Sequence, residues 1–462
     1  MSERLLFVTG HLAKPRLEAV LAHMSPGFDY EIVDIGVKVA ALMTEPILLN
    51  RLPRPLNATR AILPGRCRAD LDRLAQAFST PFQRGPDELK DLPAFFGKRG
   101  GPPDLSRHDL RIFAEIVDAS SLSLDALSER AQSMRAAGAD VIDLGCLPDT
   151  PFPALEAVVR RLKGEGLAVS VDSADLEELR RGAAAGADYL LSLTEQSFEI
   201  ALESRARPVL IPATHGDLDS LERAYSAARS RGLDPILDPI LDPIHFGFSD
   251  SLARYRELRA SLPQAEMMMG TGNLTELTEA DSVGVTAMLL GVCSELHIAN
   301  VLTVQVSPHT RRTIQEHDAA RRILFAARAD DSLPKGYGRA LLQVHDRSPL
   351  PNTPEEIAVA AAQVKDGNFR IEVAADGVHV FNRDGHWIAA DAFSLFDKLG
   401  VERDGAHAFY LGAELQKAEI AYRLGKRYVQ DEPLDWGCAV DRPQEDRTRL
   451  AEAGHTLRRR GG

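Results

Sequence analysis

The strongest constraint on the fold is a regular alternation of apolar stretches and amphipathic helical patterns through the central half of the chain. Eight short apolar stretches, rich in β-branched residues, recur between residues 104 and 333. They span residues 111–117, 140–144, 168–171, 189–192, 208–211, 235–240, 267–269 and 301–304. Eight strand–helix units in about 220 residues match the repeat of a (β/α)8 barrel. We therefore predict an α/β fold in which residues 104–333 form a TIM barrel.

Two smaller regions flank the predicted barrel. Residues 1–103 alternate short apolar strands with helices, which predicts a small, Rossmann-like α/β domain. Residues 334–440 contain three apolar stretches separated by Asp-Gly turns and followed by a helical pattern at 413–424. This arrangement predicts an α+β domain built on an antiparallel meander. The charged end, residues 441–462, is predicted to be a disordered tail.

Composition excludes several classes of protein. The formal net charge is −13, which argues against a nucleic-acid-binding surface. The longest apolar runs, such as 287–292, are too short to cross a membrane. The four cysteines, Cys67, Cys146, Cys293 and Cys438, lie far apart and have neither zinc-ligand spacing nor a disulfide pattern. We expect a soluble, cytoplasmic protein that binds small molecules.

Polar residues gather where the predicted barrel strands end, which is the face that carries the chemistry in this architecture. They are Asp118, Asp143, Thr150, Asp172, Ser192, Asp238, Asp242, Asn273, Gln305 and Ser307, and Gly270 begins the loop that carries Asn273. A single aspartate there could instead cap the helix that follows it. Capping explains less well why so many strand ends carry carboxylates or amides, so we predict that this face holds the functional site.

Three of these strand ends resemble motifs of dihydropteroate synthases. The second strand reads Gly138-Ala-Asp-Val-Ile-Asp-Leu-Gly145, the third Val169-Ser-Val-Asp-Ser173, and the sixth Leu241-Asp-Pro-Ile-His-Phe-Gly-Phe248. The motifs occur in the family's order and spacing, and the resemblance covers residues 104–333. It implies a pterin-binding barrel.

The resemblance also implies which residues hold the pterin. Asp172 and Asp242 would accept parallel N–H bonds from the 2-aminopyrimidinone edge of the ring, with Ser192 where the family has an asparagine. The segment Asp234–Ile244 repeats with a period of four, so Asp238 is an alternative to Asp242, although the downstream Phe-Gly-Phe favours Asp242. The predicted pterin-binding set is Asp143, Asp172, Ser192, Asp238, Asp242, Gly270 and Asn273, and Asp118, Asp172 and Asp242 are the predicted catalytic residues.

Other positions depart from the folate-pathway enzymes. The first-strand loop is short and offers only Glu115 and Asp118 as oxygen ligands for Mg2+. Asn273 stands where the family has its seventh-strand lysine, and Thr303 and Gln305 replace the eighth-strand arginine and histidine. These differences imply that either the second substrate or the chemistry differs from that of the folate enzymes, whose second substrate is p-aminobenzoate.

The eighth strand, Val301–Arg311, resembles that of the homologues involved in tetrahydromethanopterin biosynthesis. That resemblance implies a transferase that joins 6-hydroxymethyl-7,8-dihydropterin diphosphate, as its Mg2+ complex, to an arylamine bearing ribose 5-phosphate. The residues predicted to bind phosphate or the second substrate are Thr150, Gln305, Ser307, Arg311 and Arg312. We expect a homodimer. Two alternatives stay open: a non-catalytic pterin-binding subunit and a pterin-dependent corrinoid methyltransferase.

Overall fold

The computed structural model describes residues 3–24, 26–37, 43–65, 67–86, 89, 92–97, 103–148 and 150–441. The chain divides into two compact units, Met1–Pro103 and Asp104–Gly462. The predicted disordered tail lies, apart from Asp441, outside the described residues. The predicted division of the second unit at residue 333 stays a prediction.

The first unit contains a four-stranded parallel sheet with the order β2-β1-β3-β4. Its strands are β1 (Arg4–Thr9), β2 (Asp29–Asp34), β3 (Arg60–Leu63) and β4 (Phe82–Arg84), and its helices are α1 (Lys14–Met24), α2 (Glu45–Arg51), α3 (Leu71–Phe78) and α4 (Leu92–Phe95). Strand β4 was not predicted from the sequence, because it is a three-residue edge strand in which only Phe82 is buried. Two apolar clusters pack on the sheet, so helices cover both of its faces.

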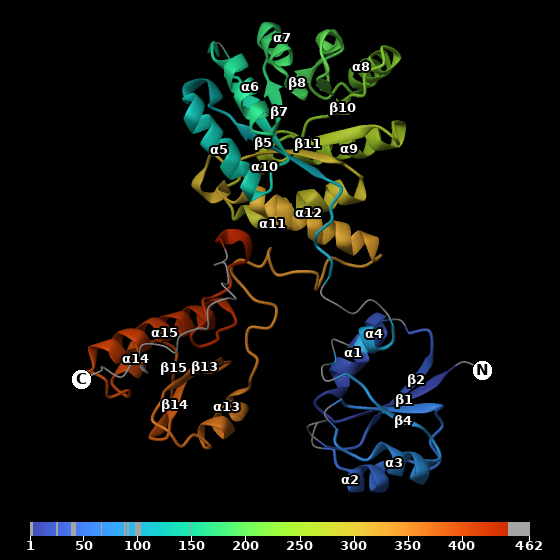
Figure 1. Ribbon diagram of the computed structural model, residues 1–462, viewed down its shortest axis with the longest axis vertical. Helices are drawn as coiled ribbons and strands as arrows, with labels where there is room; N and C mark the ends of the chain where they lie inside the picture. Colours follow the sequence, from blue (N-terminus) through green and yellow to red (C-terminus); the bar gives the residue numbers. More distant parts are fainter. Residues whose placement is uncertain are drawn as a thin grey trace. The chain divides into compact units, whose positions relative to one another are not determined.

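The second unit begins with a closed barrel of eight parallel strands, as predicted (Figure 1). The strands are β5 (Arg111–Ile116), β6 (Val141–Gly145), β7 (Ala168–Asp172), β8 (Tyr189–Leu193), β9 (Arg207–Leu210), β10 (Ile236–Leu237), β11 (Glu266–Gly270) and β12 (Asn300–Val304). Strand β10 is shorter than the predicted 235–240. Pro235 and Pro239 flank it, and because proline has no N–H it cannot extend the hydrogen-bonded ladder.

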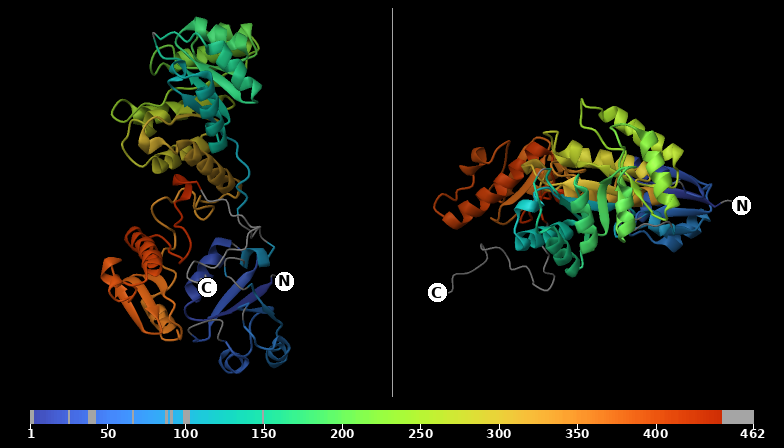
Figure 2. Two further views of the ribbon diagram at one scale, coloured as in Figure 1. Left: turned by 60° about the vertical axis from the view of Figure 1, so that its left-hand side comes forward. Right: turned by 90° about the horizontal axis from the view of Figure 1, so that it is seen from above.

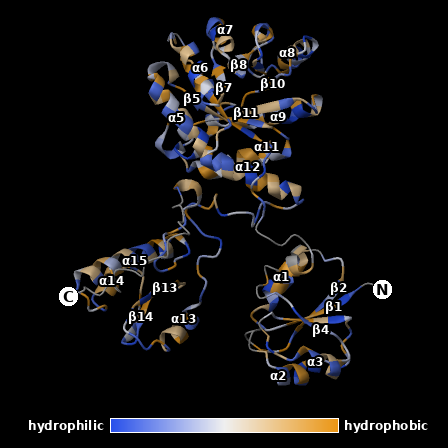
Figure 3. Cartoon of the chain, viewed as in Figure 1, coloured by the Kyte–Doolittle hydropathy of each residue, from blue (hydrophilic) through white to orange (hydrophobic). Residues whose placement is uncertain are grey.

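A ring of helices surrounds these strands (Figure 2). The helices are α5 (Leu124–Ala137), α6 (Leu155–Gly164), α7 (Leu176–Ala185), α8 (Leu218–Ser230), α9 (Phe248–Ser261), α10 (Gly272–Thr275), α11 (Ser282–Glu295) and α12 (Thr313–Ala329). A 3-10 helix, Phe198–Glu203, takes the helical position between β8 and β9. The largest apolar core lies between strands and helices, and hydrophobic colouring is concentrated along the barrel strands (Figure 3).

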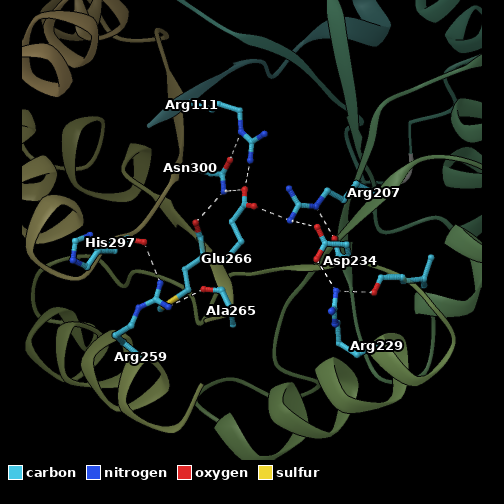
Figure 4. Close-up of polar contacts among 11 residues, drawn as sticks. Arg111, Arg207, Arg229, Asp234, Arg259, Ala265, Glu266, His297 and Asn300 are labelled. Carbon is cyan, nitrogen blue, oxygen red and sulfur yellow. Dashed lines mark hydrogen bonds and ion pairs between the residues drawn. The ribbon is translucent and has the colours of Figure 1, made fainter. Parts of the chain in front are cut away.

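The interior of the barrel is filled in layers. Large apolar side chains, including Phe113, Val141 and Met268, close its middle. Below them, the first residues of four strands form a polar network around Glu266 (Figure 4). Arg111, Arg207 and Asn300 all donate hydrogen bonds to the Glu266 carboxylate, at 2.8 Å for Arg207 and 2.9 Å for Asn300. The closed base leaves the opposite end of the barrel as the place for a ligand.

Replacing Glu266 with alanine is expected to destabilise the protein by about 2–4 kcal/mol, because it leaves two half-buried arginines without their carboxylate. Although burial opposes ionisation, the hydrogen bonds from Arg207 and Asn300 hold the pKa of Glu266 below its usual value. Glu266 is therefore ionised at neutral pH, and its contribution to the stability of the fold is fully present there. Urea denaturation measures the loss. Glu257→Ala, at an exposed position of α9, is the control and should change stability by less than about 0.5 kcal/mol. Equal stability of the two variants would contradict the structural role of the network.

The remainder of the second unit carries a three-stranded antiparallel sheet with the order β13-β14-β15. Its elements are β13 (Arg370–Ala374), β14 (Gly377–Asn382), β15 (Gly385–Ala389), α13 (Pro354–Ala361), α14 (Phe393–Phe396) and α15 (Gly405–Leu424). Helix α15 begins eight residues before the predicted 413. Asp404 caps it by accepting a hydrogen bond from the backbone of His407, and a side chain at Gly412 would meet nothing within 4 Å.

Candidate functional site

Three neighbouring strands bring carboxylates together at the open end of the barrel. In the register of the sheet, Glu115 on β5 pairs with Asp143 on β6, and Gly145 on β6 pairs with Asp172 on β7. Asp143 is completely buried, while Glu115 and Asp172 are partly buried. Because parallel strands end at the same face, these three side chains share one small volume.

Few groups neutralise or bind these carboxylates. Ser170 donates a hydrogen bond to Asp143 Oδ1, and Ser192 donates one to Asp172 Oδ1 at 3.0 Å. The second oxygen of Asp143 is buried and has no hydrogen-bond partner. Within the described ranges, no lysine, arginine or histidine forms an ion pair with Glu115, Asp143 or Asp172. Buried acceptors without donors are costly, so this arrangement suits a ligand that supplies donors.

The local environment makes these carboxyls harder to ionise. Burial, and then the negative charge of Asp172, raise the pKa of Glu115 from 4.5 to about 7. Burial and the charges of Asp172 and Glu115 raise the pKa of Asp143 well above its ordinary value. Burial also raises the pKa of Asp172, against the opposing hydrogen bond from Ser192. Perturbed carboxyls grouped at a barrel mouth mark a candidate functional site.

Gly145 is needed for this arrangement. A Cβ at this position would lie 2.5 Å from Glu115 Oε1 and 3.1 Å from the Cα of Val117. The absence of a side chain on β6 therefore gives the Glu115 carboxylate the space it occupies.

A fourth carboxylate, Asp238, joins the cluster from the loop after β10. Its Oδ1 accepts hydrogen bonds from the buried Tyr255 hydroxyl and from the Ile240 backbone N–H, both at 2.8 Å. Burial raises the pKa of Asp238 to about 6, against those two bonds, and the charge of Asp172 adds to the rise. Its Oδ2 lies 4.0 Å from a Cβ built on Gly270. We call Glu115, Asp143, Asp172 and Asp238 the acidic cluster.

Asp242, the residue that the sequence favoured as the sixth-strand ligand, lies in the same loop and is already paired. Its Oδ2 accepts a hydrogen bond from Arg254 at 2.7 Å and lies 3.4 Å from His215 Nε2. Arg254 also donates to the carbonyl of Ile240, so Asp242 and Arg254 hold the loop in shape. Asp238 therefore belongs to the acidic cluster and Asp242 to an ion pair with Arg254. The preference for Asp242 as the sixth-strand ligand, drawn from the Phe-Gly-Phe motif, stays a prediction.

The remaining predicted residues take different places. Asn273, on α10, donates a hydrogen bond to the Leu241 carbonyl at 2.7 Å and so ties the loop after β11 to the loop after β10. Gln305 donates to the Arg311 carbonyl, and Thr150 is exposed on the loop after β6. These contacts hold loops together, and a direct role in binding stays a prediction for each residue.

The two arginines that were predicted to bind phosphate have different partners in the structure. Arg312 donates to the Cys438 carbonyl at 2.9 Å and pairs with Asp441 at 2.8 Å, so it holds the C-terminal segment of the described chain. Arg311 is exposed, and its guanidinium donates a hydrogen bond to the carbonyl of Pro308 at 3.3 Å. Of the two arginines, Arg311 is the one free to meet an anion.

Glu115 and Asp118, the predicted magnesium ligands, do not form a preformed metal site. Asp118 is paired with Arg130 at 3.0 Å. Across the described residues, no three histidine, cysteine, aspartate or glutamate side chains are grouped so that they could hold a metal ion. Magnesium ligation by Asp118 and Glu115 stays a prediction that would require Arg130 to release Asp118.

Three residues that organise this face escaped sequence analysis. Tyr255 and Arg254 on α9 position Asp238 and Asp242, and Glu276 accepts hydrogen bonds from the loop after β12. A buried tyrosine and arginine on a helix give no sign in the sequence that they point toward a strand end. The donors to Glu276 include backbone N–H groups, which leave no signal in a sequence.

Two family models match parts of the chain. Residues 3–87 match a family of unknown function, DUF6513. Residues 365–431, which include β13, β14 and β15, match the family described as PterinBD-DUF4346. In the described part of the chain, no helix combines the length and apolarity that crossing a bilayer requires.

The chain is also similar to individual proteins. It is 28% identical over 367 residues to the uncharacterized protein MJ0107 of Methanocaldococcus jannaschii, covering 70% of this chain and 69% of that protein. Among solved structures, it is similar to a Yersinia pestis dihydropteroate synthase with a pterine-sulfa conjugate, at 19% identity and a TM-score of 0.37 over 50% of this chain and 98% of that one. It is also similar to the Thermus thermophilus dihydropteroate synthase in complex with 6HMPPP, at 22% identity and a TM-score of 0.37 over 47% of this chain and 93% of that one.

Proposed function

We propose that the barrel mouth binds a dihydropterin and that the protein is a transferase of the dihydropteroate synthase type. The observation that carries the proposal is the acidic cluster, in which carboxylates from three strands and from the loop after β10 converge and form no ion pair with any described lysine, arginine or histidine. Such a cluster suits a flat ligand whose edge presents several N–H donors. The 2-amino-4-oxo edge of a pterin is such an edge. The family model named PterinBD-DUF4346 matches residues 365–431 of the same chain, outside the barrel, and agrees with a pterin-related protein.

The roles of the individual carboxyls follow from their surroundings. Asp172 and Asp238 each have one oxygen held by protein donors, which leaves the other oxygen for the ligand. Their ionised forms would accept N–H bonds from opposite sides of the pterin edge. Ser192 and Tyr255 fix the two carboxylates, so little orientational freedom is lost on binding.

In the proposed reaction, the ligand is 6-hydroxymethyl-7,8-dihydropterin diphosphate and the second substrate is an arylamine. The bond between the pterin methylene carbon and the diphosphate oxygen breaks, and pyrophosphate leaves with that electron pair. The arylamine nitrogen forms a new bond to the methylene carbon and releases its proton to solvent. Positive charge that develops on the pterin during this exchange is stabilised by the adjacent carboxylates, and orientation of the two substrates contributes most of the rate.

The second substrate, the pathway, the metal ion and the oligomeric state are proposed from the sequence resemblance to the tetrahydromethanopterin homologues. We propose that the arylamine carries a ribose 5-phosphate, that the reaction belongs to tetrahydromethanopterin biosynthesis, that Mg2+ enters as the counter-ion of the diphosphate substrate, and that the protein acts as a homodimer. The loss of the family's lysine, arginine and histidine at Asn273, Thr303 and Gln305 supports an altered second substrate.

Calorimetric titration with the dihydropterin diphosphate tests the binding step. We expect micromolar affinity and at least about tenfold weaker binding of inorganic pyrophosphate, which lacks the ring. Equal affinities for the two ligands would contradict a pterin site. Binding without any transfer to an arylamine would instead indicate a non-catalytic subunit, and methyl transfer to a corrinoid protein would indicate the methyltransferase alternative.

The two aspartates of the loop after β10 should behave differently. Asp238→Asn is expected to weaken dihydropterin binding by about tenfold or more, because it removes a charge-assisted acceptor and leaves the loop contacts of Asp242 intact. Asp242→Asn should instead lower the thermal midpoint, because Arg254 loses its carboxylate partner. Calorimetric titration measures the affinity of both variants, and thermal denaturation measures their midpoints. Loss of binding in Asp242→Asn alone would reverse the assignment.

A further inference from the structure

The loops after the seventh and eighth barrel strands are joined by one carboxylate that occupies a set of anion-binding donors. Glu276 directly follows α10. Its Oε1 accepts hydrogen bonds from the Val306 N–H at 2.8 Å and from the Thr310 hydroxyl at 2.6 Å. Its Oε2 accepts one from the Ser307 N–H at 3.0 Å. We call Val306 N–H, Ser307 N–H and Thr310 Oγ1 the loop-eight donors.

These donors stabilise the ionised form of the Glu276 carboxyl group. Although burial opposes ionisation, the hydrogen bonds from Thr310, Val306 and Ser307 hold the pKa of Glu276 below its ordinary value. Successive backbone N–H groups with a nearby hydroxyl are also what a phosphoryl group needs. In (β/α)8 barrels, the loops after strands seven and eight are a frequent place for phosphate.

The surroundings of the loop-eight donors suit the binding of a phosphoryl group better than a permanent hydrogen-bonded contact with the Glu276 carboxylate. Arg311 lies one residue after Thr310, is exposed, and forms no ion pair within the described ranges. Its guanidinium is therefore available to a second anion at the same loop. Val306 is 60% exposed and Ser307 is partly exposed, so two of the three donor residues lie near the surface at the open end of the barrel, whereas Thr310 is buried.

We propose that the loop-eight donors form a phosphoryl-binding site and that Glu276 is a resident substitute for the phosphoryl group, which the substrate displaces. This inference rests on the proposed function only for the source of the phosphoryl group, which is either the diphosphate of the pterin or the phosphate ester of the arylamine. Arg311 binds the incoming anion once Glu276 has left.

The arrangement has a consequence for selectivity. Free phosphate must displace Glu276 using its own contacts alone, whereas a substrate can use the binding energy of its ring to drive the same displacement. The resident carboxylate therefore disfavours small inorganic anions at the site. If the contact between Glu276 and the loop-eight donors had only a structural role, it would give no such selectivity.

The test uses the full-length protein and two probes that contain no pterin, inorganic pyrophosphate and ribose 5-phosphate, titrated at one ionic strength. Glu276→Gln removes the charge and is expected to tighten the binding of one probe by about tenfold or more. The probe that gains identifies the source of the phosphoryl group. Glu279→Gln is the matched control, since it removes the same charge from an exposed position three residues away and should change neither affinity by more than about twofold. Adding Arg311→Ala to Glu276→Gln should abolish the gain.

Three outcomes would overturn the proposal: no gain for either probe in Glu276→Gln, an equal gain in Glu279→Gln, or a gain that survives Arg311→Ala. If Glu276→Gln does not fold, Glu276→Asp replaces it, because the shorter side chain cannot reach both loop N–H groups. Unchanged affinity in that variant also overturns the proposal. Since neither probe contains a pterin, failure of the proposed pterin site would leave this result unaffected.

Discussion

Asp172→Asn is expected to weaken the binding of dihydropterin diphosphate by about 100-fold or more. The variant replaces a carboxylate that would accept charge-assisted N–H bonds with an amide that presents one acceptor and one donor, and the donor faces the ligand's own donors. The hydrogen bond from Ser192 can still form to the amide oxygen, so the local structure should persist. Calorimetric titration at pH 8 measures the loss, and the circular dichroism spectrum checks the fold.

Asp175→Asn is the matched control for this experiment. Asp175 lies three residues further along and caps α7 by accepting a hydrogen bond from the Glu177 N–H. Asparagine caps helices about as well as aspartate, so this variant should bind the pterin with unchanged affinity. Unchanged binding in Asp172→Asn, or the same loss in both variants, would contradict the assignment of Asp172.

Glu115→Gln is expected to stabilise the ligand-free protein at pH 8 and to leave its stability unchanged at pH 4. Burial and the charge of Asp172 raise the pKa of Glu115 from 4.5 to about 7. A carboxyl whose pKa is raised on folding favours the folded state below its unfolded pKa, and that contribution is lost as the pH rises through the folded value. One pKa unit corresponds to about 1.4 kcal/mol, so the gain at pH 8 is on the order of 3 kcal/mol.

Urea denaturation of Glu115→Gln and the parent protein at the two pH values measures this effect. Glu129→Gln, at an exposed position of α5, controls for the change in net charge and should shift stability by less than about 0.5 kcal/mol at either pH. Equal stability of Glu115→Gln and the parent protein at pH 8 would mean that the acidic cluster carries no unfavourable charge. The predicted gain would instead show that the cluster is retained at a cost to stability, as expected for a binding site.

The barrel itself was readable from the sequence because its eight apolar stretches are regularly spaced. The sixth strand was predicted too long, since the sequence shows its apolar residues but not how Pro235 and Pro239 interrupt the ladder. The beginning of α15 was predicted wrongly because Gly412 suggests the boundary of a helix. In the structure a side chain at Gly412 would meet nothing within 4 Å, and the cap at Asp404 determines where the helix starts.

Within the candidate site, the carboxylates at the strand ends were predicted from the sequence, and the residues that position them were not. Asp143 and Asp172 end regular strands, so their convergence follows from strand register alone. Asp238 and Asp242 could not be separated, because the period-four repeat gives both the same local sequence. Their different partners, Tyr255 and Arg254, lie on the following helix, and their orientation depends on packing.

Long-range partners explain the remaining differences. Arg312 was predicted to bind phosphate from its place beside the eighth strand. Its carboxylate partner, Asp441, is 129 residues away in sequence, which no local pattern could reveal. The same limit applies to Glu276, whose donors are 30 to 34 residues away.

The most direct test of the proposed transferase is the release of pyrophosphate from 6-hydroxymethyl-7,8-dihydropterin diphosphate in the presence of Mg2+. We expect the purified protein to release pyrophosphate only when an arylamine is added, in equal amounts with a new pterin–arylamine product. A ribose 5-phosphate substituent on the arylamine is expected to increase the rate. Tight pterin binding with no arylamine-dependent release of pyrophosphate would contradict the transferase assignment.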